Sequence, residues 1–224
     1  MKQTRAILLM VVSAMMFTLT VRAQFPADVK EVLKKCEEKM GSYNTPAGVV
    51  FDMDMKLKVS ILKVNGTMKT YAKEKKYFNI LTMQFPEHEF KMEIGFDGTQ
   101  KWLYKSSMDG DEKDSLVITK TQSAKNDYAM NLGYEKEYNK ARMKEEGRYY
   151  EITFSGPKKK DLPKKSSIKI AKDSYLLREY SVDMDMGPFT GRMILTITKI
   201  TKGCSDHWLK LDMNRYKNAV VVRH

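Results

Sequence analysis

The sequence predicts a mainly β protein with helices (α+β), built as a strongly curved antiparallel half-barrel of about ten strands. Apolar and polar residues alternate with a period of two through most of the chain after residue 48. Helical periodicity is confined to one segment before residue 42 and one near the middle of the chain. A second sheet would leave these helices without a place, so we expect them to cover the concave face of a single sheet.

The chain begins with a segment typical of a secretory signal peptide. Residues 1–23 carry positive charges followed by an apolar stretch, which is shorter than the roughly 20 residues that cross a bilayer. Small residues before Gln24 predict cleavage at that point, and an uncleaved anchor is the alternative. The remaining residues, 24–224, have the length of a single domain with a substantial core. We therefore expect an exported protein.

The first element after the leader is an amphipathic helix. Pro26 suits the first turn of a helix, and Gly41 suits its end. Apolar residues recur between them at steps of three and four, namely Val29, Val32, Leu33, Cys36 and Met40. Lysines and glutamates occupy the other positions, so one side of this helix must pack against the sheet.

The strands follow the period-two pattern. About ten strands are expected from the alternating ranges 49–59, 64–68, 77–85, 90–96, 102–104, 116–121, 149–154, 168–171, 175–186, 189–200, 209–211 and 220–222. The Asn65-Gly66 pair, inside the range 64–68, is a candidate turn.

The segment from Asp97 to Tyr104 carries the strongest turn signal. Asp97-Gly98 suits a tight hairpin, because Gly accepts the positive φ that such a turn requires. An alternating strand precedes it, and Trp102 and Tyr104 place large rings on one face of the returning strand.

The middle of the chain breaks the alternation. Residues 124–144 are loosely helical, with Gly133 as a break, so we expect one or two helices inserted between two sets of strands.

The net charge of +12 favours anionic partners such as lipid head groups or an acidic protein surface. Nucleic acid is not an expected partner behind an export signal, since no binding motif is present. Two cysteines follow the leader, Cys36 and Cys204. In an exported protein they either form a disulfide that ties the first helix to the C-terminal strands, or they are two buried free thiols.

In its order of elements the chain resembles the outer-membrane lipoprotein carrier (LolA) family and its wider superfamily of lipid-binding half-barrels. The family's hairpin motif of Asp-Gly followed by an aromatic strand matches Asp97, Gly98, Trp102 and Tyr104. The C-terminal ranges 197–200, 209–211 and 219–222 resemble the family's closing hairpin. An Arg-Pro pair that helps to hold the family's cavity lid is absent, so lid control is not carried over.

The resemblance implies a periplasmic location, a monomer, and an acyl-chain cavity on the concave face. Methionine is flexible and polarizable, so methionines on strand faces suit ligands of variable shape. The residues we expect to line the cavity are Phe51, Met53, Met55, Leu57, Phe90, Met92, Ile94, Trp102, Tyr180, Met184, Met186 and Met193. The alternative is that these side chains only pack against the helices.

Other chemistry has little support. By alternation Arg178 falls on the apolar face, where it either contacts the lid or a ligand head group, or sits at the rim and reaches water. In the repeated Asp-Met-Asp-Met, carboxylates and thioethers point to opposite faces of a strand, so we expect no metal site and no cofactor. No catalytic motif is present, and we expect the protein not to be an enzyme.

These observations lead to a functional hypothesis. We expect a periplasmic carrier that shields acyl chains of lipoproteins or a related lipid and hands them toward the outer membrane. Its expected partners are an inner-membrane donor and an outer-membrane acceptor protein. The alternatives are a non-transferring amphiphile-binding or sensor module, and a structural envelope protein whose core is filled by its own side chains.

Overall fold

The computed structural model describes residues 25–60, 62–107, 113–121, 134–160, 162–186 and 189–224. The expected signal peptide lies outside these residues, and so do residues 124–133 of the expected central helical insertion.

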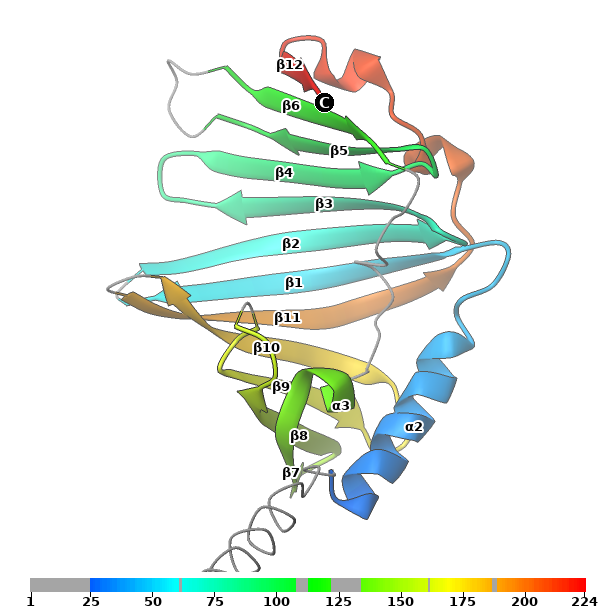
Figure 1. Ribbon diagram of the computed structural model, residues 1–224, viewed down its shortest axis with the longest axis vertical. Coiled ribbons are helices and arrows are strands. Elements are labelled where there is room, and N and C mark those ends of the chain that lie inside the picture. Colours follow the sequence, from blue (N-terminus) through cyan, green and yellow to red (C-terminus); the bar gives the residue numbers. More distant parts are fainter. Residues whose placement is uncertain (1–24, 61, 108–112, 122–133, 161, 187–188) are drawn as a thin grey trace, which may run out of the picture.

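The described chain forms one α-helix of several turns and a single twelve-stranded sheet (Figure 1). The helix is α2, Ala27–Gly41, and it begins directly after Pro26 as expected. The strands are β1 Val49–Val59, β2 Leu62–Lys73, β3 Lys76–Gln84, β4 Glu89–Phe96, β5 Gln100–Lys105, β6 Ser115–Lys120, β7 Tyr138–Glu146, β8 Tyr149–Pro157, β9 Lys165–Ala171, β10 Leu177–Met186, β11 Phe189–Lys202 and β12 Val220–Arg223. The short helices are α3 Tyr134–Glu137, η1 Asp206–Leu209 and η2 Met213–Tyr216.

The strand order places the two halves of the chain side by side. The sheet runs β12-β6-β5-β4-β3-β2-β1-β11-β10-β9-β8-β7. Neighbours are antiparallel except β12, which pairs with β6 in parallel. The sheet stays open, with β12 at one edge and β7 at the other, and this confirms a curved, mainly antiparallel sheet with two strands more than expected.

The concave face carries the first of two cores. The apolar side of α2, from Val29 to Met40, is buried in one cluster with residues of β1, β7, β8, β9, β10 and β11. So many strands can contact one helix only if the sheet bends around it. Figure 1 shows α2 and α3 on this side of the sheet. The N-terminal helix therefore covers one half of the concave face.

The second core lies on the opposite face of the sheet. Its buried residues are Tyr71, Phe78, Trp102, Leu116, Ile118, Leu209 and Tyr216. The first five come from β2, β3, β5 and β6, and the last two come from the segment around η1 and η2, which packs over these strands. Trp102 lies directly over Gly95 of β4, where a Cβ atom would be 2.0 Å from the indole ring. Only glycine leaves room for this contact.

A buried carboxylate fastens the C-terminal segment to the sheet. Glu93 is 1% exposed and accepts a 2.6 Å hydrogen bond from the Tyr216 hydroxyl. The Glu93 carboxylate also pairs with the ammonium group of Lys91 at 2.6 Å and the guanidinium group of Arg215 at 3.5 Å. Burial and then the hydrogen bond to Glu93 raise the pKa of Tyr216 above its usual range, so the phenol remains a donor. Removal of one partner would leave the buried carboxylate less well compensated and should destabilise the fold.

Several expected boundaries are wrong. The Asn65-Gly66 pair lies inside β2, and the turn from β1 to β2 is at Ser60, which has a φ of 52°. The expected helix ending at residue 144 is strand β7 from Tyr138 onward. Residues 209–211 form no strand, because Leu209 ends η1. The expected closing hairpin does not exist either, since β11 pairs with β1 and β10 while β12 pairs with β6.

The Asp-Gly hairpin is confirmed between β4 and β5. Gly98 has a φ of 102°, and the Asp97 carboxylate accepts hydrogen bonds from the backbone and side chains of Thr99 and Gln100. Burial alone would raise the pKa of Asp97, but these hydrogen bonds outweigh it and lower the pKa.

Candidate functional site: the concave apolar face

The strand register brings apolar side chains from both halves of the chain onto one face. Residues directly opposite each other in antiparallel strands point to the same side. One row across β1, β2, β3 and β4 consists of Met53, Met68, Leu81 and Met92. The next row consists of Met55, Gly66, Met83 and Phe90. On the other side of β1, Leu57 lies opposite Met193 of β11, which lies opposite Val182 of β10.

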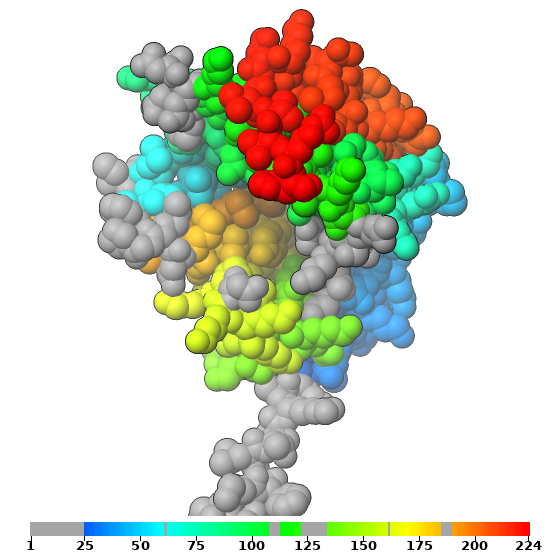
Figure 2. Space-filling view, turned by 45° about the horizontal axis from the view of Figure 1, so that its top comes forward, coloured from blue at the N-terminus to red at the C-terminus, as the bar shows by residue number. Residues whose placement is uncertain are grey.

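This face is closed at one end and open at the other. Near α2 it belongs to the first core, where Phe51 and Met53 are buried. Away from α2 the same face is partly open, although Met55, Val64 and Val182 are buried. The half-buried side chains there are Leu57, Met68, Leu81, Met83, Phe90, Met92, Ile94, Leu103, Val117, Met184, Met193 and Leu195. Figure 2 shows the molecule hollowed on this side, with orange atoms of β11 visible between the cyan and green strands and the yellow ones. The result is a broad apolar surface without a complete cover in the described part of the chain.

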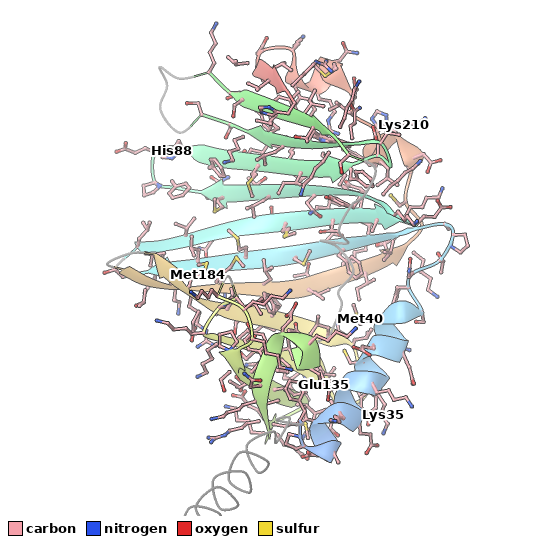
Figure 3. The ribbon with its side chains drawn as sticks, in the orientation of Figure 1. Lys35, Met40, His88, Glu135, Met184 and Lys210 are labelled. Carbon is pink, nitrogen blue, oxygen red and sulfur yellow. The ribbon has the colours of Figure 1, made fainter. Side chains whose placement is uncertain are left out.

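The expected cavity residues divide into three groups. Phe51, Met53 and Met55 face the concave side but are buried, Met55 to 2% exposure. The half-buried members on this face are Leu57, Phe90, Met92, Ile94, Tyr180, Met184 and Met193. Met184 lies on β10 at the end of the sheet away from α2, whereas Met40 lies in the last turn of α2 (Figure 3). Met186 pairs with Phe189 next to the β10–β11 turn, but its side chain lies outside the described part.

Trp102 is the exception, and its expected place in the cavity is wrong. Trp102 lies opposite Gly95, whereas the concave residues of β4 are Phe90, Met92 and Ile94. Gly95 is an odd number of positions away from them, so Trp102 points to the convex face. It is 1% exposed in the second core.

Arg178 lies at a β-bulge in β10. Leu177 pairs with Ile170 of β9, and Glu179 pairs with the next residue of that strand, Lys169, so Arg178 is an extra residue without a partner position. The bulge gives the buried concave position to Leu177, which is 4% exposed, and leaves Arg178 half-buried. Simple alternation therefore misplaces Arg178.

The register adds residues that the sequence pattern alone did not assign to the site. Met68, Leu81, Met83 and Leu195 lie in the same rows as the expected residues. Their strands are recognisable from alternation, but only the pairing partners show which face of each strand is concave.

Buried polar side chains, including Thr70, Asn79 and Ser166, interrupt this apolar face. Thr70 and Asn79 lie opposite each other on β2 and β3 and are 6% and 4% exposed. The Asn79 Oδ1 atom is buried without a hydrogen-bond partner. Tyr180 also belongs to this face, and burial raises its pKa to about 12, so its phenol is uncharged at neutral pH.

The two cysteines are free thiols in the structure, so the disulfide is not formed. Cys36 is fully buried in the first core, whereas Cys204 packs at the margin of the second core on the other face. Burial, with a smaller contribution from Glu37, raises the pKa of Cys36 to about 12 despite a hydrogen bond from the Leu177 backbone. We therefore expect the buried thiol of Cys36 to react slowly in the folded protein.

Groups of three or more His, Cys, Asp or Glu residues that could hold a metal ion are absent from the described part of the chain. Within the same residues, no helix has the length and apolar character to cross a membrane.

No protein-family model matches the chain, and no curated protein matches its sequence. Among solved structures, an uncharacterized conserved protein of Thermus thermophilus has a TM-score of 0.50 at 12% identity, over 88% of this chain and 99% of that one. The Mycobacterium tuberculosis lipoprotein LppX has a TM-score of 0.42 at 11% identity, over 79% and 98% of the two chains. A LolA superfamily protein of Nitrosomonas europaea has a TM-score of 0.37 at 11% identity, over 82% and 97%.

The architecture is the one that the sequence resemblance implied, with a single open sheet curved around a helix on its concave face. The chain shares its fold with the uncharacterized conserved protein of Thermus thermophilus. At this identity the likeness concerns the fold alone, and the chemistry of this chain must be argued from its own residues.

Proposed function

We propose that this protein is an exported, non-enzymatic lipid-binding protein that holds acyl chains of lipoproteins or a related lipid against its concave face. The observation that carries this proposal is the row of half-buried apolar side chains from β4 through β1 to β10. A monomeric protein rarely leaves so large an apolar surface partly open unless it binds something there.

The chemistry of the face suits an acyl chain. Each methylene group removed from water contributes about 0.8 kcal/mol, so a long chain needs no specific polar partner to bind. Met68, Met83, Met92, Met184 and Met193 supply flexible thioether side chains over the open part of the face. Such side chains adapt to chains of different length and saturation.

In its full form the proposal is a periplasmic carrier. It would accept lipoprotein acyl chains from an inner-membrane donor and deliver them to an outer-membrane acceptor. A face that is only half-covered supports this role, because a shallow apolar surface releases its ligand more readily than a closed cavity.

Native mass spectrometry of the chain purified from a periplasmic extract tests ligand binding directly. We expect a bound diacyl or triacyl species that organic extraction releases. A ligand-free mass that stays unchanged after incubation with palmitate and with a triacylated lipoprotein would refute the proposal and favour a structural protein.

A matched pair of variants tests where the ligand binds. Leu81 and Thr82 are neighbours on β3 and both half-buried, but they point to the concave and convex faces respectively. Leu81→Lys should weaken displacement of a fluorescent fatty acid by palmitate about tenfold or more, because a charge then lies where the chain packs. Thr82→Lys should leave the affinity within about threefold. Equal effects of both variants would place the ligand elsewhere.

Transfer is tested separately. The ligand-free protein should release a lipoprotein from inner-membrane vesicles into the soluble fraction. The protein loaded in this way should then deliver the lipoprotein to outer-membrane vesicles. Binding of fatty acid without such release would identify a non-transferring binding module.

A further inference from the structure

Strand β12 leaves one edge of the sheet open. It pairs with β6 only, and it is the last strand in the sheet order. Figure 1 shows β12 beside β6 at the top of the sheet, and Figure 2 shows the red C-terminal residues at the surface.

The backbone of β12 presents unused hydrogen-bonding groups. The amide of Val220 donates to the Asp114 carbonyl at 2.8 Å, and the amide of His224 donates to the Ile118 carbonyl at 2.9 Å. In a parallel pair, alternate residues point their backbone groups toward the neighbouring strand. The backbone amide and carbonyl groups of Val221 and Arg223 therefore point away from β6. On that side of β12 the described chain has no further strand.

The side chains of β12 are unusual for an exposed edge. Val220, Val221 and Val222 are 50%, 39% and 42% exposed. Strand edges in natural proteins are commonly protected from pairing by charged residues. The opposite edge strand, β7, has this protection, with exposed Lys140, Arg142, Lys144, Glu145 and Glu146. Protection at one edge and three exposed valines at the other indicate that β12 is kept available for pairing.

The charges around β12 are basic. Lys217 shortly precedes the strand in sequence, and Lys113 is the neighbour of Asp114, whose carbonyl accepts the hydrogen bond from the Val220 amide. Lys120 and Arg223 lie at the other end of the strand. All four are exposed, and none forms an ion pair within the described residues. The nearby Asp114 carboxylate is already engaged by Tyr104 and Ser107. A second copy of this chain would bring like charges together, whereas an acidic segment would be attracted.

We propose that β12 binds an extended, acidic segment of a partner protein, which adds to the sheet as a further strand. The backbone groups of Val221 and Arg223 provide the hydrogen bonds, the valines provide apolar contacts, and the flanking basic residues select for acidic sequence. This interaction is independent of the lipid-binding face.

Fluorescence anisotropy with labelled peptides tests the proposal on the full folded chain. The acidic probe alternates valine or threonine with glutamate, and a matched probe carries lysine in place of each glutamate. We expect the acidic probe to bind at least about tenfold more tightly and to weaken as salt increases. Val221→Pro removes the outward amide and should reduce binding about tenfold or more, because an edge strand tolerates proline but loses the donor. Val221→Ala keeps the amide and serves as the matched control, with affinity within about threefold of the original.

Three results would overturn the proposal. The first is equal affinity for the two probes, and the second is binding of the acidic probe to Val221→Pro as tightly as to Val221→Ala. The third is a concentration-dependent dimer in sedimentation velocity that Val221→Pro abolishes, since it would assign the edge to a second copy of this chain.

Discussion

A hydrogen bond from Tyr104 holds the carboxylate of Asp114 at the junction of β5 and β6. The Tyr104 hydroxyl donates to Asp114 Oδ2 at 2.6 Å, and the Ser107 amide donates to Oδ1 at 2.9 Å. These two hydrogen bonds lower the pKa of Asp114, with Tyr104 contributing most and burial opposing the shift. A carboxyl group with a lowered pKa stabilises the folded state above its unfolded pKa, and this contribution is lost as the pH falls through its folded pKa.

The variant Tyr104→Phe should therefore raise the pKa of Asp114 toward its usual value. The variant should be less stable at pH 7, and its difference from the original should disappear at a pH below the folded pKa of Asp114. An NMR titration of the Asp114 carboxyl and urea unfolding at several pH values check both effects. Tyr149→Phe, on β8, is the control and should leave the titration unchanged. An unchanged pKa in Tyr104→Phe would show that the hydrogen bond is not formed.

Asn79 places an unsatisfied amide oxygen in the concave face. Its Oδ1 atom has no partner although the residue is only 4% exposed. Burial of such a group costs about 1–3 kcal/mol, so Asn79→Leu should raise Tm by a few degrees. Asn79→Asp, which buries a charge at the same place, should lower Tm. Differential scanning calorimetry measures both, and a lower Tm for Asn79→Leu would mean that the amide has a partner in solution.

At the scale of elements, the packing of α2 determines the chemistry of the cysteines. Cys36 lies on the buried side of this helix, while Cys204 lies on the other face of the sheet and is partly exposed. Burial raises the pKa of both thiols, but Cys204 is partly exposed, so in the folded protein it should react with Ellman's reagent faster than Cys36. Cys36 should react only after unfolding in guanidinium. Cys204→Ser should remove the fast reaction, and Cys36→Ser should remove the slow one. A mass about 2 Da below that of the reduced chain would instead show a disulfide.

Local sequence predicted where helices and hairpins form better than it predicted which strands pair with each other. The helix after Pro26 and the Asp97-Gly98 hairpin were predictable because their signals lie within a few residues. The parallel pairing of β12 with β6 was not, since it joins residues about a hundred positions apart.

The same limit applies to the candidate site. Alternation identified most residues on the apolar faces of β1, β4 and β10, but it could not show that Trp102 faces the second core. The face of Trp102 depends on its register with Gly95 and on the C-terminal segment, which arrives from far along the chain. At Arg178, a single extra residue in β10 changed which side chain is buried.

At the scale of the whole molecule, one sheet separates two cores with different tasks. The core around α2 and the open apolar surface share the concave face, whereas the aromatic core and its Glu93 network lie on the convex face. A change in the convex core should therefore affect the stability of the sheet without altering the concave surface that we propose as the ligand site.

Substitutions on the two faces should separate these tasks. Trp102→Ala leaves a cavity at the centre of the convex core. It should lower the free energy of unfolding by about 3–5 kcal/mol and Tm by roughly 10 °C. Measured at about 10 °C, where the variant remains folded, its affinity for the fluorescent fatty acid should stay within about threefold of the original. Met92→Ala removes a half-buried side chain from the concave face, so it should change Tm little but weaken binding severalfold. Loss of binding in folded Trp102→Ala, with full binding in Met92→Ala, would place the ligand on the convex side of the sheet.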